Sequence, residues 1–125
     1  MTHRLEYLRG PAKAENLMVT KLYANQAKLI FDKTAGSYVI GTVPGNSILE
    51  YVVVNIDTGF DDTLTLGNAS DADAYIADAD FPKTAGMHDP IILNIPISTA
   101  TGVRMAVGAN TTGAGTIWLL WRPLK

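Results

Sequence analysis

The chain contains no cysteine. That absence excludes disulfide frameworks, thiolate metal sites and a cysteine nucleophile. Charged residues make up only 18% of the chain, which is below the fraction of about a quarter that is usual in soluble domains. A weakly charged surface is equally consistent with a subunit that is partly covered in an assembly and with an ordinary monomer.

Excess positive charge and long apolar runs are also missing. The formal net charge is −2, whereas nucleic-acid-binding proteins usually carry a basic patch or stripe. No apolar run approaches the roughly 20 residues that a transmembrane helix needs. The first 16 residues lack the apolar core of a secretion signal. We therefore expect no nucleic-acid or membrane partner, and a protein that stays in the cytoplasm until it is assembled.

Histidine occurs only at His3 and His88. His88 precedes Asp89, and such a pair can orient an imidazole for catalysis. No serine in a nucleophile-elbow motif accompanies the pair, so a histidine in a surface loop is the favoured interpretation. We expect no catalytic residue and no bound cofactor.

What the chain does contain is a ten-residue apolar stretch at positions 47–56, SILEYVVVNI. β-Branched and aromatic residues dominate it, and turn signals stand on both sides, which favours a central strand over a buried helix. Simple alternation predicts two buried faces, one formed by Ile48, Val52, Val54 and Ile56 and the other by Leu49, Tyr51 and Val53.

Seven further segments have the length and pattern of short strands. Their short connections favour antiparallel pairing, and together with the central strand they predict an all-β, two-sheet sandwich resembling a jelly roll. Asn25 and Gln26 are expected to form a turn, and Pro96 marks an edge strand or a bulge. Residues 70–80 allow about two helical turns capped by Ser70. The expected strands cover residues 18–23, 28–31, 37–43, 63–66, 91–98, 103–107 and 116–122.

Seven aspartates lie between positions 57 and 80. Oxygen ligands at this density suit calcium, although the spacing does not match an EF-hand loop. Aspartate also favours turns and helix caps, which is our preferred interpretation, and we expect no metal site. A carboxylate pair for glycoside hydrolysis is a third alternative. The residues are Asp57, Asp61, Asp62, Asp71, Asp73, Asp78 and Asp80.

The chain divides into a polar arm at residues 1–16, interrupted by Gly10-Pro11, and a single β-sandwich domain at residues 17–125. In the last strand Trp118 and Trp121 fall on opposite faces, so one is expected in the core and the other outside. An outward tryptophan can anchor a subunit contact or stack on a sugar ring. The candidate interface residues are Arg4, Leu5, Tyr7, Leu8, Arg9, Trp118 and Arg122.

Two stretches, VVVNIDTGFDDTLTLGNASDADAYIADAD from Val52 and TTGAGTIWLLWRP from Thr111, resemble small virion structural proteins of tailed bacteriophages. The resemblance implies a non-enzymatic β-sandwich subunit located in the virion and made in the host cytoplasm. A capsid decoration or cement protein that binds the major capsid protein or other virion subunits, as a dimer or trimer, is the leading expectation. A tail or head–tail joining protein is the alternative. The remaining alternatives are a carbohydrate-binding module and a hydrolase.

Overall fold

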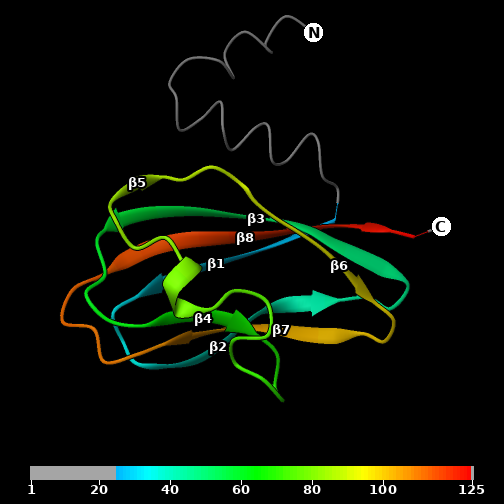
Figure 1. The fold of residues 1–125 in the computed structure, drawn as a ribbon, viewed down its shortest axis with the longest axis horizontal. Coiled ribbons are helices and arrows are strands. Elements are labelled where there is room, and N and C mark those ends of the chain that lie inside the picture. The colour runs from blue at the N-terminus through cyan, green and yellow to red at the C-terminus, as the bar shows by residue number, and fades with distance from the viewer. Residues whose placement is uncertain (1–24, 125) are drawn as a thin grey trace, which may run out of the picture.

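The computed structural model describes residues 25–124, which form two antiparallel β-sheets packed face to face (Figure 1). This confirms the predicted all-β, two-sheet sandwich. Within these residues no helix has the length and apolar character needed to cross a bilayer. The elements are β1 (Gln26–Asp32), β2 (Gly36–Val43), β3 (Ser47–Thr58), β4 (Leu64–Gly67), the 3₁₀ helix η2 (Asp78–Asp80), β5 (Gly86–Met87), β6 (Ile91–Ile97), β7 (Thr101–Val107) and β8 (Ala114–Pro123).

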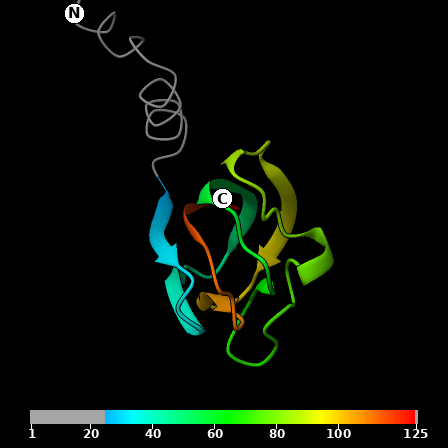
Figure 2. The same cartoon turned by 90° about the vertical axis from the view of Figure 1, so that its left-hand side faces the viewer.

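The large sheet has the strand order β1-β8-β3-β5, with β6 also paired to β3, and the small sheet has the order β2-β7-β4. Every pairing is antiparallel. Figure 2 looks along the sandwich and shows β1 and β6 at opposite sides of the large sheet. β6 pairs with β3 alone among the described strands, so Pro96 lies in an edge strand, as expected.

β3 is central, as predicted, but its faces are not the ones that simple alternation gives. Leu49 pairs with Trp121 and Tyr51 pairs with Leu120, so Glu50 is an extra residue in β3 relative to β8. A bulge of this kind reverses the side-chain parity of the strand. Leu49 therefore lies in the core with Val52, and its predicted place beside Tyr51 is wrong.

The core lies between the sheets and is formed by apolar side chains from both. Phe31 and Phe60 stack at its edge with ring centroids 5.4 Å apart. Gly113 has a φ of 149°, and a Cβ at this position would collide with the Phe60 ring. Full burial of each large apolar side chain contributes about 1.5–3 kcal/mol. The fully buried residues include Val43, Leu49, Val52, Leu64, Leu66, Val103, Met105, Ile117 and Leu119.

The other predicted strands in the described range are confirmed within a few residues, with two corrections. Gln26 belongs to β1 rather than to a turn. β5 lies in a stretch where no strand was predicted, and there Met87 pairs with Asn55 of β3. The predicted strand at residues 18–23 lies outside the described residues.

The two helical turns that residues 70–80 allowed do not form, and the short η2 turn is the helical part of this segment. Ile76 exchanges backbone hydrogen bonds of 2.9 and 3.0 Å with Leu66, which holds this part of the chain extended against β4. The Asn68 side chain accepts hydrogen bonds from the Ser70 and Asp71 amides, at 2.9 Å each, and so forms a turn where a helix cap was expected. Local hydrogen bonding of this kind competes with helix formation.

We expect Leu119→Ala to lower the free energy of unfolding by about 2–5 kcal/mol, because it opens a cavity in a packed core. Leu119 is 0% exposed and lies in β8 opposite Val52. Val39→Ala, at a position 49% exposed, is the matched control and should change stability little. Urea denaturation of both variants checks this, and equal losses would show that Leu119 does not belong to the main core.

Candidate interface surfaces

The outer face of the large sheet carries a small apolar cluster. Trp118 and Leu120 of β8 pack beside Val53 of β3, and the three are 9%, 3% and 8% exposed. Tyr51 packs against them from β3. The two tryptophans therefore lie on opposite faces, as the alternation predicted, with Trp118 facing away from the main core and Trp121 packing against it. We name Tyr51, Val53, Trp118 and Leu120 the outer cluster.

An ion pair lies near this cluster at the bulge. Arg122 Nε donates a hydrogen bond of 2.7 Å to Glu50 Oε2, and their side chains are 53% and 17% exposed. The parity reversal at Glu50 places its carboxylate beside β8 rather than in the core. Arg122, predicted as an interface residue, therefore already has a partner in its own chain. An exposed pair of this kind contributes about 0–1 kcal/mol to stability.

The most exposed large apolar side chains lie at the two opposite edges of the large sheet. Ile30 of β1 is 73% exposed and Ile92 of β6 is 66% exposed. Both strands were predicted, but the sequence does not single out these two residues, because the alternation of short strands does not reveal which strands form sheet edges. Exposed apolar residues at opposite edges are suited to contacts with two different neighbours.

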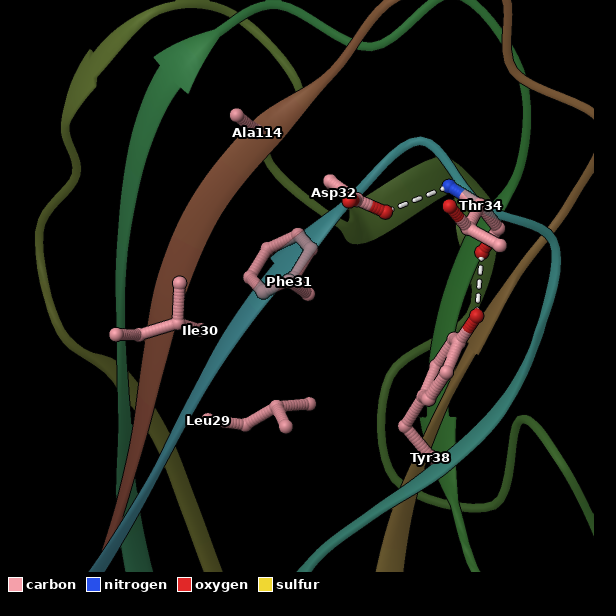
Figure 3. A pocket seen from close by; sticks show the side chains of 7 residues that line it. All are labelled: Leu29, Ile30, Phe31, Asp32, Thr34, Tyr38 and Ala114. Carbon is pink, nitrogen blue, oxygen red and sulfur yellow. Dashed lines mark hydrogen bonds between the residues drawn. The ribbon is translucent and has the colours of Figure 1, made fainter.

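A groove of about 460 Å³ opens beside Ile30, between β1 and the start of β2 (Figure 3). Its polar groups are already paired, because Thr34 donates its amide hydrogen to Asp32 and accepts a hydrogen bond of 2.8 Å from the Tyr38 hydroxyl. This arrangement suits an apolar side chain of a partner better than a polar ligand. The groove is lined by Leu29, Ile30, Phe31, Asp32, Thr34, Tyr38 and Ala114.

Asn110 ties together the two loops that precede β4 and β8. It is 9% exposed, and its Oδ1 accepts a hydrogen bond of 2.6 Å from the Asp62 amide. Its Nδ2 donates to the carbonyl oxygens of Thr63 and Gly108. This role could not be predicted, because a buried asparagine and a turn asparagine look alike in a sequence.

Several of the clustered aspartates bind backbone groups of the loops. Asp61 accepts hydrogen bonds from the Thr111 hydroxyl and amide, which lower the pKa of its carboxyl. Asp78 has a lowered pKa because it accepts hydrogen bonds first from Lys83 and then from the Leu64 amide. These contacts are the turn chemistry that we preferred over calcium binding.

Two further observations on the acidic stretch concern the pKa of Asp73 and the arrangement of the carboxylates as metal ligands. The pKa of Asp73 is raised, first by a hydrogen bond with Asp71 and then by the negative charge of that carboxylate. Within residues 25–124, no three histidine or acidic side chains converge in an arrangement that could hold a metal ion.

His88 contacts the backbone rather than a catalytic partner. Its Nε2 lies 2.7 Å from the Thr84 carbonyl oxygen, so the ring closes the loop before β6. The backbone amide of His88 also donates to the Val54 carbonyl oxygen at 3.1 Å. The predicted interface residues Arg4, Leu5, Tyr7, Leu8 and Arg9 lie outside the described residues.

Solved structures with a similar chain trace come from two bacteriophage capsids. A chain in the acidic stable capsid structure of Helicobacter pylori bacteriophage KHP30 has a TM-score of 0.55 and 11% identity, over 81% of this chain and 88% of that one. A chain in the cyanophage Pam1 capsid asymmetric unit has a TM-score of 0.49 and 20% identity, over 78% of this chain and 81% of that one. No protein-family model and no curated protein matches the sequence. The first likeness shows that this sandwich shares its fold with a chain of a phage capsid.

We expect stability to fall in acid because of Asp61 and Asp78. Their lowered pKa values mean that the unfolded chain binds these protons more tightly than the folded chain does. Their contribution is therefore present above the ordinary aspartate pKa of about 3.9 and is lost as pH falls through the lower folded-state values. Asp73 has the opposite effect on the pH dependence of stability. Because its pKa is raised, the folded chain binds this proton more tightly than the unfolded chain does.

Melting temperatures measured between neutral pH and pH ~3 test this linkage. Asp61→Asn and Asp78→Asn should each lose stability at neutral pH and show a smaller further loss in acid. Asp80→Asn, on the exposed side of the same turn as Asp78, is the matched control. An unchanged acid dependence in the first two variants would remove these carboxylates from the explanation.

Proposed function

We propose that the protein is a non-enzymatic structural subunit of a bacteriophage particle, made in the host cytoplasm and carried in the virion. The observation that carries the proposal is the shared fold with a chain of a phage capsid, which extends over 81% of this chain. The resemblance of residues 52–122 to small virion proteins of tailed phages supports the same function.

Within the particle, the protein acts as a capsid decoration or cement protein that bridges subunits of the major capsid protein. Ile30 and Ile92 give the sandwich apolar contact points at opposite edges of one sheet. The groove beside Ile30 gives one of these edges a concave site for a side chain of the capsid. A subunit that binds only the mature shell stabilises it by mass action, so many weak contacts of this kind strengthen the head. The protein associates with itself as a dimer or trimer.

A tail or head–tail joining protein is the second candidate, because the same exposed edges would serve a ring of subunits. The carbohydrate-binding alternative depended on an outward-facing tryptophan together with the Asp-rich loops, and Trp118 is only 9% exposed. A sugar-stacking site needs an accessible indole face. The hydrolase alternative depended on the aspartate pairs and on His88, whose Nε2 contacts a backbone carbonyl oxygen.

We expect Ile30→Asp and Ile92→Asp to weaken binding of the protein to capsids while leaving its melting temperature near that of the unmodified chain. Both side chains are mostly exposed, so the carboxylate stays hydrated in the free protein but would be buried in a contact. The measurement is co-sedimentation of the purified protein with heads that lack it, and in parallel with isolated tails.

Val39→Asp is the matched control, because Val39 is an exposed apolar residue of the small sheet. It should co-sediment normally. Full binding by both edge variants would contradict the assignment of these edges to the capsid contact. Binding to tails but not to heads would favour the joining role over decoration.

The arm at residues 1–16 contributes a second contact in this proposal. Arg4 and Arg9 pair with carboxylates of the neighbouring subunit, and Leu5, Tyr7 and Leu8 supply apolar contact. An arm that becomes ordered on binding can reach across a junction that a compact domain cannot bridge.

Deleting residues 1–16 should therefore leave the melting temperature of the sandwich nearly unchanged but reduce co-sedimentation with heads. Thermal melts and sedimentation of the truncated chain measure the two effects separately. A truncated chain that binds heads normally would exclude the arm from the contact. A truncated chain that fails to fold would show that the arm belongs to the domain.

A further inference from the structure

The outer cluster is buried on a sheet face over which no other described strand lies. Trp118 is 9% exposed and Leu120 is 3% exposed. The small sheet does not cover them, because it packs on the opposite face of the large sheet. The apolar residues of the cluster come from β3 and β8 alone within residues 25–124. Side chains of a strand stand roughly perpendicular to the sheet, so an uncovered face would leave a large indole well exposed. Some further part of a chain is needed to cover this face.

The beginning of the described chain lies beside this cluster. The Asn25 carbonyl oxygen accepts a hydrogen bond of 3.1 Å from the Trp121 amide, and Gln26 pairs with Leu120. Eight residues span at most about 26–29 Å when extended. Crossing from β1 over β8 to β3 requires only about 10 Å, since neighbouring strands lie about 4.8 Å apart. Residues 17–24 can therefore reach every member of the outer cluster.

The sequence immediately before Asn25 also has the appropriate chemistry. Residues 17–24 read LMVTKLYA and are mostly apolar, in contrast to the polar residues 1–16. A segment joined directly to β1 has a far higher effective concentration at the cluster than a segment from another molecule. We infer that residues 17–24 of the same chain pack on the outer cluster and form a third layer over Trp118 and Leu120. This inference does not depend on the proposed virion function.

The absence of cysteine makes a direct test available. A nitroxide attached to Thr20→Cys in the full-length chain is the only thiol label, and Trp121→Phe leaves Trp118 as the only tryptophan. We expect the label to quench most of the Trp118 emission, because nitroxides quench at contact distance. A label at Ser70→Cys, in an exposed turn after the small-sheet strand β4, is the control and should leave the emission unchanged.

Mixing labelled with unlabelled protein distinguishes a cluster covered by residues 17–24 of its own chain from a cluster covered by a second copy. Quenching within one chain persists when the labelled protein is diluted into a large excess of unlabelled protein that carries Trp118→Phe and Trp121→Phe. Quenching that disappears on mixing would mean that another copy covers the cluster, and this would overturn the inference. Absence of quenching from the Thr20 label in a folded protein would overturn it as well.

A second set of full-length variants keeps both tryptophans, in case Trp121→Phe disturbs the fold. Met18→Ser combined with Leu22→Ser should shift tryptophan emission to longer wavelength and increase quenching by acrylamide. Leu5→Ser combined with Leu8→Ser changes the same kind of residue in the arm and should do neither. Unchanged emission in the first pair, or an equal shift in both pairs, would contradict the docking of residues 17–24.

Discussion

The antiparallel pairing of β3 with β8 determines what each face of the large sheet presents. Its register places Val52 opposite Leu119 and Val54 opposite Ile117 on the inner face, and Val53 opposite Trp118 on the outer face. The main core and the outer cluster are therefore two sides of one ladder. Because the side-chain period of a strand is two, a slip of one residue in this ladder would exchange the two sets.

The different surfaces of the sandwich suit different kinds of contact. The loops before β4 and β8 are tied by Asn110 and Asp61, which satisfy backbone amides that would otherwise need water. The edges of the large sheet, by contrast, expose Ile30 and Ile92. A rigid body with fixed loops and apolar edges loses little conformational entropy when it binds a neighbour.

The fold could be predicted from the sequence because most of its strands are short, apolar and separated by strong turn signals. That Trp118 and Trp121 lie on opposite faces of β8 followed from alternation, but which of them faces the main core did not. The faces of β3 did not, because the bulge at Glu50 depends on pairing with β8 and leaves no local signal. The extended conformation around Ile76 was missed for a similar reason, since its hydrogen bonds are made to Leu66, ten positions earlier in the chain. Ile30 and Ile92 could not be singled out before the strand order was known.

The bulge at Glu50 has a consequence for how the chain tolerates changes in length. On either side of it, β3 presents apolar residues to the core with opposite parity, and Glu50 provides the offset between the two halves. Removing one residue from a surface loop would alter only that loop, and removing Glu50 would leave a regular strand with Leu49 and Val52 still facing the core. Removing a paired residue such as Val53, by contrast, would force one half of β3 to turn its core residues outward. Natural variants of this sandwich should therefore vary in length in their loops and at the bulge, and keep the number of paired residues in β3 constant.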